Sequence, residues 1–264
     1  MVTALEAIVF GLLQGLLEWL PVSSEGNLAL LMVAWLGLSP AETLRTAVLL
    51  HFGTGAAALV YYRDEVVRIV LGVDEGYRRM RLLLAAITLV TGAVGLPVYL
   101  LLNLSLAQGE TLLTLTGLAL VVTGLVQRSR GAAGSRGSAG LSWGEALGLG
   151  VVQGLSIIPG LSRSAVTTTL LLVRGYSPPE SLRVSFLMSI PASFAASLGL
   201  ILIEDVAVTQ ASLISISVAA LTGFLALGAL VRVAERVSFW KVCVGLGVVA
   251  LLGLVPGLIG LVTA

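Results

Sequence analysis

The chain has 264 residues, of which 57% are hydrophobic and only 11% are charged, and its mean hydropathy is +1.05. A soluble globular chain carries about 25% charged residues, so this one lacks the polar side chains to cover a surface in water. The net charge of +1 gives no reason to expect a nucleic-acid partner, and the single cysteine, Cys243, excludes an internal disulfide and a multi-cysteine metal site. The composition therefore places the chain in a lipid bilayer.

Two apolar regions are broken in the middle by polar residues. Residues 5–36 are interrupted by Pro21-Val-Ser-Ser-Glu-Gly-Asn27, and residues 143–173 by Pro159-Gly-Leu-Ser-Arg-Ser164. Each break separates two helices of roughly 10 to 15 residues, which are too short to cross a membrane. Irregular backbone at membrane depth is tolerated only where it is buried in protein or lines a wet cavity. Both regions therefore predict re-entrant helical hairpins.

Six other segments approach the ~20 apolar residues that a membrane-spanning helix needs. In chain order they are residues 46–62, 82–102, 111–126, 184–203, 211–231 and 242–262. The sequence thus predicts an all-α polytopic membrane protein with six transmembrane helices and two re-entrant hairpins.

Basic residues in the loops predict the orientation, because short cytoplasmic loops carry an excess of Arg and Lys. The loop at 63–81 has five arginines, and the segments 128–142 and 232–241 carry three basic residues each. The loop at 103–110 has none, and the loop at Glu204 and Asp205 is acidic. Placing the basic loops in the cytoplasm puts both termini outside, with the first hairpin entering from outside and the second from inside.

An internal repeat accompanies this topology. Gly11-Leu-Leu-Gln14-Gly15-Leu16 matches Gly150-Val-Val-Gln153-Gly154-Leu155, and a polar break follows each copy. A hairpin and three spans make an odd number of crossings, so the halves 1–127 and 143–264 of this single membrane domain are inverted. The Gly-, Ser- and Arg-rich stretch 128–142 joins them as a linker. Inverted repeats place their functional site near the midplane, where broken helices meet.

Glu18 lies in an apolar run, and an ionisable residue inside a membrane segment is a functional hypothesis by default. Gln14 lies one turn earlier, and residues four apart share a helix face, so the two side chains should project together. Such an oxygen-bearing pair suits a hard divalent cation that also bridges to phosphate. The alternative is a buried carboxylate that only hydrogen-bonds to the other hairpin.

The second break combines the features of an anion site. Its candidate phosphate-binding residues are Gly160, Ser162, Arg163, Ser164 and Thr167. They surround the predicted N-terminus of a short helix, which offers free N–H groups and a positive dipole end. The guanidinium fork of Arg163 matches phosphate oxygens in bidentate fashion. Arg163 is therefore expected to bind either a phosphate or a carboxylate of the other repeat, Glu18 or Glu25.

The first break supplies hydroxyl, carboxylate and amide groups at the repeat-related place: Ser23, Ser24, Glu25 and Asn27. If the two hairpins meet, these residues lie opposite the arginine of the second break. A serine near a base and a cation is the layout for nucleophilic phosphoryl transfer. Which serine attacks is left open, and Ser23 suits a helix cap as well as it suits chemistry.

Two further residues carry hypotheses of their own. His51 is the only histidine, near the start of the span 46–62, and is either a hydrogen-bonded structural residue or a general base. Pro191 predicts a kink in the span 184–203, and a kink there would open space for a lipid tail.

At its two breaks the chain resembles the undecaprenyl-pyrophosphate phosphatase family, historically the bacitracin-resistance phosphatases. The matching motifs are Gln14-Gly-Leu-Leu-Glu18-Trp-Leu-Pro-Val-Ser-Ser24-Glu-Gly26, Leu50-His51-Phe-Gly-Thr, and Pro159-Gly-Leu-Ser-Arg-Ser164 with Thr167. Hydrophobicity and motif spacing run in parallel along essentially the whole chain. The resemblance implies an enzyme that releases inorganic phosphate from a C55-type polyprenyl diphosphate, depends on a divalent cation such as Mg²⁺ or Ca²⁺, and recycles the glycan carrier of the cell envelope.

The resemblance also implies roles by motif position. Glu18 takes the acidic metal or catalytic role, Ser24 that of nucleophile or phosphate ligand, and Arg163 that of phosphate clamp. The residues implied to line the phosphate site are Ser162, Ser164 and Thr167. We expect a plasma-membrane protein whose site opens to the outer face. Its expected partners are polyprenyl diphosphate and membrane lipids, and whether a second copy of the chain forms a homodimer with it is left open.

Two positions depart from the family pattern. Gln14 stands where many members have a glutamate, and Asn27 occupies the catalytic position where the Ser-Ser-x-Gly motif normally continues with a histidine. An amide cannot take up a proton near neutral pH, so the base would have to be Glu18, Glu25 or His51. The alternatives to a phosphatase are a polyprenyl-phosphate transporter or flippase, or a catalytically impaired lipid-phosphate binder.

Overall fold

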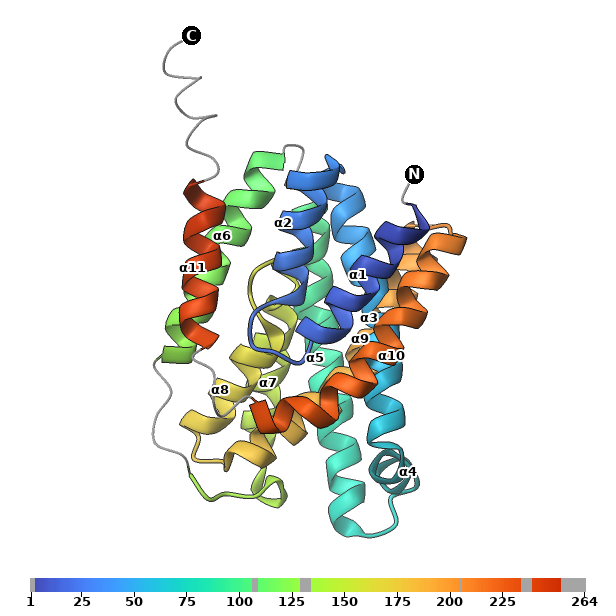
Figure 1. The fold of residues 1–264 in the computed structure, drawn as a ribbon. Helices are drawn as coiled ribbons and strands as arrows, with labels where there is room; N and C mark the ends of the chain where they lie inside the picture. Colours follow the sequence, from blue (N-terminus) through green and yellow to red (C-terminus); the bar gives the residue numbers. More distant parts are fainter. Residues whose placement is uncertain (1–2, 106–108, 129–133, 205, 234–238, 253–264) are drawn as a thin grey trace.

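The computed structural model describes residues 3–105, 109–128, 134–204, 206–233 and 239–252. Over these residues the chain folds into eleven α-helices and one short 3-10 helix, η1 (Ser138–Gly140), without a β-strand (Figure 1). The helices are α1 (Ala4–Leu17), α2 (Ser24–Leu36), α3 (Pro40–Tyr61), α4 (Arg63–Leu71), α5 (Glu75–Ser105), α6 (Gly109–Arg128), α7 (Trp143–Leu155), α8 (Arg163–Val173), α9 (Pro178–Glu204), α10 (Gln210–Val233) and α11 (Phe239–Leu252). The all-helical fold class is confirmed.

Within the described residues, four helices are long and apolar enough to cross a membrane, which makes the chain a multi-pass membrane protein. Their spanning parts are Ala41–Tyr61, Glu75–Leu102, Pro178–Glu204 and Gln210–Ala229, and they coincide with four of the six predicted spans. The predicted span 111–126 lies in α6, whose apolar part Thr114–Val126 is shorter. The span 242–262 begins in α11 and continues outside the described residues.

The first broken region forms two short helices, as predicted, but its break lies earlier than expected, at residues 18–23 and not at 21–27. The first helix, α1, starts at a capping box formed by Thr3 and Glu6, and it ends at Leu17. Helix α2 resumes at Ser24, because the Ser23 hydroxyl accepts a hydrogen bond from the backbone N–H of Gly26 and so caps the new helix. The polar residues from Ser24 onward therefore lie in the first turn of α2 and not in a loop.

The second broken region follows the same plan. A capping box of Ser142 and Glu145 starts α7, which ends at Leu155, and Ser162 caps α8 through the backbone N–H of Ala165. Arg163 is the first residue of α8, as predicted. In Figure 1 the α1–α2 turn and the α7–α8 turn approach each other in the middle of the bundle from opposite ends.

The glycines of the repeated motif allow two very close helix contacts. A Cβ on Gly15 of α1 would lie 1.9 Å from the Thr222 hydroxyl of α10, and a Cβ on Gly154 of α7 would lie 2.7 Å from the Cβ of Val94 on α5. Small residues four apart let helix backbones approach closely, which is how helices associate where lipid offers no hydrophobic driving force. Each hairpin is thereby fastened to a long helix of the opposite half.

The segment that begins at residue 134, after the residues 129–133 that the structure does not describe, packs against the start of α7. Arg136 donates to Glu145 (3.0 Å) and to the hydroxyl of Tyr176 (3.0 Å), and Tyr176 donates to Glu145 (2.8 Å). Burial, together with this carboxylate, raises the pKa of Tyr176 to about 12, so it remains a protonated donor. This part of the predicted linker 128–142 is therefore held to the second half of the chain.

We predict that Gly154→Ala destabilises the protein by about 1–3 kcal/mol, because the new methyl group overpacks the α5–α7 contact. Gly144→Ala is the matched control on the same helix, since a Cβ there meets no atom of the described residues within 4 Å. It should be neutral or stabilising by up to about 1 kcal/mol from helix propensity. Thermal unfolding in detergent measures both, and equal midpoints for the two variants would contradict the packing argument.

Candidate active site

The two breaks meet at their tips. The Ser23 hydroxyl accepts a hydrogen bond from the backbone N–H of Gly160 at 3.1 Å, besides the bond from Gly26 that caps α2. A Cβ on Gly26 would lie only 2.8 Å from the Cα of Gly160, which itself has a left-handed φ of +96°. Gly160 is thus required for its backbone conformation and for the close approach. Ser23 serves as a cap, the role that the sequence had left open beside chemistry.

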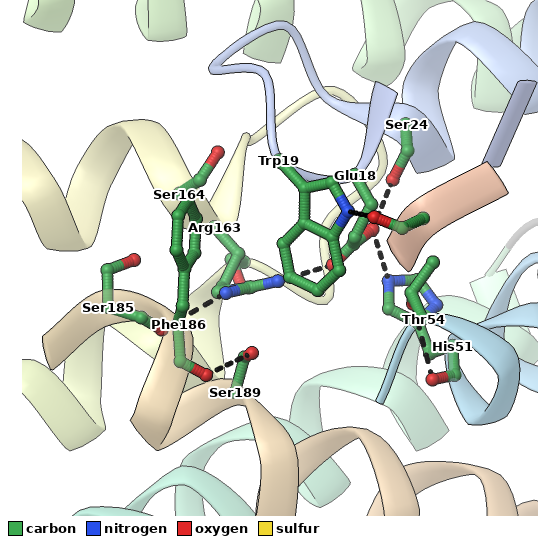
Figure 2. Close-up of polar contacts among 12 residues, drawn as sticks. Glu18, Trp19, Ser24, His51, Thr54, Arg163, Ser164, Ser185, Phe186 and Ser189 are labelled. Carbon is green, nitrogen blue, oxygen red and sulfur yellow. Dashed lines mark hydrogen bonds and ion pairs between the residues drawn. The ribbon is translucent and has the colours of Figure 1, made fainter. Parts of the chain in front are cut away.

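Glu18 lies at the centre of a polar cluster between the hairpins (Figure 2). It is 6% exposed, and its Oε2 accepts hydrogen bonds from the Ser24 hydroxyl at 2.7 Å and the Gln14 amide at 2.9 Å. Its Oε1 is ion-paired with Arg163 of the second hairpin. A carboxylate held by a guanidinium and several donors is stable in its charged form despite burial.

His51 of α3 completes this cluster. Its Nε2 lies 3.3 Å from a Glu18 oxygen and 3.5 Å from a Glu25 oxygen, while Nδ1 lies 2.8 Å from the Ala47 carbonyl. Both ring nitrogens face acceptors, so the ring can hold or release a proton at Nε2 while Nδ1 stays hydrogen-bonded. All three residues that the sequence offered as bases, Glu18, Glu25 and His51, therefore lie together.

Arg163 is fixed from two sides. One guanidinium nitrogen pairs with Glu18, and the other donates to the backbone carbonyl of Ser185 on α9 at 3.2 Å. The neighbouring residue of Glu18, Trp19, is buried, donates to the Gly223 carbonyl at 3.0 Å and packs edge-on against Phe186 (Figure 2). The arginine expected to bind a phosphate or a carboxylate is thus paired with the carboxylate.

Three predicted site residues support the hairpin backbone. Asn27 donates from its amide nitrogen to the carbonyls of Val22 and Ser23, both at 2.8 Å. Ser164 donates to the Leu20 carbonyl at 3.1 Å, and Thr167 donates to the Arg163 carbonyl at 2.8 Å. At the position of the family histidine, the side chain therefore stabilises the turn before α2.

A cavity of about 360 Å³ opens beside the cluster. The predicted residues that line it are Glu18, Ser23, Ser24, Glu25, Ser162 and Arg163, together with His51. The positive end of the α8 dipole also borders it, since Ser162 and Arg163 are the cap and first residue of that helix. From this polar end the cavity extends between α5 and α9 to Glu204 at the end of α9.

Sequence reasoning missed the contribution of α9. Serines recur every four residues along this helix, and all are buried: Ser181, Ser185, Ser189, Ser193 and Ser197. Ser189 and Ser193 line the cavity, and the Ser185 hydroxyl lies 2.7 Å from that of Thr167. A four-residue spacing of hydroxyls in a membrane span marks one polar helix face, so the signal was present in the sequence.

Among the described residues, only one oxygen of the expected cation pair is without a hydrogen-bond partner, the buried Oε1 of Gln14. Gln14 turns its amide nitrogen toward Glu18, and both Glu18 oxygens already have partners. Among the described residues, no group of three or more His, Cys, Asp or Glu side chains could hold a metal ion. The requirement for a divalent cation stays a prediction.

Comparison with known proteins identifies the class to which this membrane fold and its site belong. Residues 7–250 match the family described as bacitracin resistance protein BacA. The chain is 42% identical over 261 residues to a protein of Haloarcula marismortui, covering 93% of this chain and 96% of that one. Relatives from Methanococcoides burtonii (38% identical; 96% of this chain, 98% of theirs) and Methanothrix thermoacetophila (37%; 94% and 96%) are also similar. All three are named undecaprenyl-diphosphatase, and this chain belongs to the BacA family.

We predict that Ser23→Ala lowers stability by about 1–3 kcal/mol, because two buried backbone N–H groups lose their acceptor. The control Ser39→Ala removes the exposed cap of α3 and should lower stability by about 1 kcal/mol without affecting the site. Unfolding midpoints and phosphate release should both be measured. Retention of full activity in Ser23→Ala would mean that the contact between the tips does not position the site.

Proposed function

We propose that this protein hydrolyses undecaprenyl diphosphate to the monophosphate and inorganic phosphate, and so recycles the lipid carrier of cell-envelope glycans. The observation that carries the proposal is the joining of Glu18, Ser24 and Arg163 at the polar end of a cavity that is otherwise mostly apolar. Such a cavity suits a molecule with a charged head and a hydrocarbon chain. The relatives named undecaprenyl-diphosphatase support the same substrate.

The hydrogen bond between Ser24 and Glu18 suits attack on phosphorus. The hydroxyl donates to the carboxylate at 2.7 Å, so a proton can pass to Glu18 as the oxygen of Ser24, or of a water in its place, attacks the distal phosphorus. The bond between that phosphorus and the bridging oxygen then breaks, and the lipid monophosphate leaves. Where Ser24 is the attacking group, a water next hydrolyses the phosphoserine, which releases inorganic phosphate and restores the hydroxyl. Arg163 and the N-terminus of α8 stabilise the charge on the transferring phosphoryl group.

Charge balance supports the expected Mg²⁺ or Ca²⁺. Two carboxylates, Glu18 and Glu25, face one guanidinium and one imidazole, and a diphosphate adds further negative charge. A divalent cation that arrives with the diphosphate would neutralise its oxygens and polarise the phosphorus centre.

The packing supports an inverted repeat of six spans and two re-entrant hairpins. Helix α1 packs on α10 as α7 packs on α5, and the pairs α3–α9 and α6–α11 are each formed by corresponding helices of the two halves. The α4–α5 turn lies at the end of the bundle opposite the C-terminal end of α9 (Figure 1). Five arginines between 63 and 81 support a cytoplasmic position for the α4–α5 end, and with it an outward-facing Glu204 end of the cavity in the plasma membrane. A homodimer stays a prediction.

A transporter or flippase would use the same architecture, because inverted repeats with broken helices are common in transporters. The names of the relatives and the contact between a serine hydroxyl and a carboxylate favour the phosphatase over transport and over passive lipid binding.

The unmodified chain in detergent should release phosphate from a C55 polyprenyl diphosphate, in the presence of Mg²⁺ or Ca²⁺ and not with EDTA. Glu18→Gln and Arg163→Gln should each lower the rate about 10²–10³-fold, since each removes a charge that acts on the transferring group. Rates in both variants that match the unmodified chain would contradict the proposal.

The double variant Glu18→Gln/Arg163→Gln controls for folding. Each single change leaves a buried charge unpaired, which lowers the folding stability by about 3–5 kcal/mol. Removing both partners often leaves the stability unchanged. Stability should therefore recover in the double variant while activity stays low. Recovery of both would mean that the ion pair is structural only.

His51→Gln should slow phosphate release more than Asn27→Ala does, because His51 contacts both carboxylates whereas Asn27 contacts backbone carbonyls. Loss of general acid–base assistance lowers rates about 10²–10⁴-fold. Asn27→Ala should mainly lower the unfolding temperature. A larger rate loss in Asn27→Ala than in His51→Gln would reverse this assignment.

A further inference from the structure

The seam between α5 and α9 is open, although the corresponding seam of the other half is closed. In the proposed repeat, α5 and α9 correspond to α10 and α3. Between α3 and α10, a Cβ on Gly53 would lie 2.3 Å from the Ile216 carbonyl, and a Cβ on Gly223 would lie 3.2 Å from that of Ala57. A Cβ on Gly92 of α5 or Gly199 of α9 meets no heavy atom of the described residues within 4 Å.

Both open glycines line the cavity that contains the polar cluster. Small side chains continue the lining along α9 at Ala192, Ala195 and Ala196. The space is therefore one continuous cavity, with a charged end at the hairpin tips and an apolar groove along the two helices.

This groove is also open sideways, toward the lipid. Leu96 of α5 and Ile203 of α9 line the cavity, and their side chains are 46% and 64% exposed although both belong to membrane-spanning helices. Exposed apolar residues that line the cavity on membrane-spanning helices point to a lateral opening. Burying a hydrocarbon chain against this apolar lining lowers the free energy, whereas placing water there does not.

Both helices that flank the groove contain a proline beside it. Pro97 lies within α5 and Pro191 within α9. Proline cannot donate the helical hydrogen bond and its ring crowds the preceding turn, which bends the helix. The space expected from the sequence at Pro191 therefore coincides with the groove, and α5 contributes a second proline.

We infer that the α5–α9 seam is the binding site for the isoprenoid chain of the lipid diphosphate, and that the chain passes through it sideways into the bilayer. The inference rests on the proposed function for the identity of the head group. A cavity of about 360 Å³ holds the diphosphate and only the first part of a C55 chain. The remainder lies in lipid, so the enzyme need not extract its substrate from the membrane.

Gly92→Leu and Gly199→Leu test this site, because a Cβ at either position meets no heavy atom of the described residues within 4 Å and the rest of the leucine would fill the groove. Gly245→Leu on α11 is the matched control, since a Cβ there also meets nothing within 4 Å and the residue does not line the cavity. The measurement is the ratio of kcat/KM for a C55 diphosphate to that for isopentenyl diphosphate, which has a single isoprene unit. Displacing about two methylene groups of the chain should lower this ratio about tenfold in the groove variants.

The control should keep the ratio of the unmodified chain. A ratio that is unchanged in both groove variants would overturn the inference and leave the seam to ordinary membrane lipid. If the unmodified chain hydrolyses neither substrate, the proposed function fails.

Cross-linking then tests the groove independently of turnover. A C55 diphosphate with a photoreactive group on its first isoprene unit should label residues 88–100 of α5 or 189–203 of α9. Labelling confined to α3, α10 or other helices would overturn the inference even in an active enzyme.

Discussion

The buried ion pair between Glu18 and Arg163 is the interaction on which the rest of the structure depends. Its partners are 145 residues apart and belong to opposite halves of the chain, so the pair forms only when both hairpins are in place. Taking either charge into the membrane alone would be very unfavourable, whereas together, with Ser24, Gln14 and the Ser185 carbonyl as further partners, they are satisfied. The close glycine contacts of α1 with α10 and of α7 with α5 hold each hairpin at the depth that the pair requires.

The same constraint explains why so many polar residues of the two breaks are structural. In the proposed topology the hairpin tips lie at membrane depth, where no water satisfies the backbone and side chains must do so. Ser23, Asn27 and Ser164 all bond to backbone groups of the tips, and Thr123 of α6 donates to the Gly160 carbonyl. This leaves Glu18, Ser24, Glu25, His51 and Arg163 facing the cavity as the groups available for chemistry.

Much of this arrangement was predictable from sequence, because the signals are local. The broken apolar runs predicted the short helices, and charges in apolar surroundings predicted that Glu18 and Arg163 are site residues. A serine before a helix predicted the caps. Long-range geometry was not predictable. The residues near His51 in the sequence do not predict that α3 brings it to Glu18. Those near Arg163 do not predict that the Ser185 carbonyl accepts its second hydrogen bond. The metal pair was inferred from spacing alone, which cannot show that Arg163 already occupies one of the carboxylate oxygens.

In the proposed repeat, the two halves differ in what each contributes. Gln14 hydrogen-bonds to Glu18, whereas Gln153 of α7 donates to Thr91 of α5. Of the two hairpins, only the first lines the cavity with acids, Glu18 and Glu25. The second presents Arg163 at a helix N-terminus. The first half packs α3 tightly on α10 and thereby fixes His51, while α9 brings small residues and serines to the seam with α5 and leaves it open. A symmetric scaffold alone would give two equivalent hairpins. Catalysis on a lipid needs an acid facing a cation and one side open to the hydrocarbon chain, and these differences between the repeats supply both.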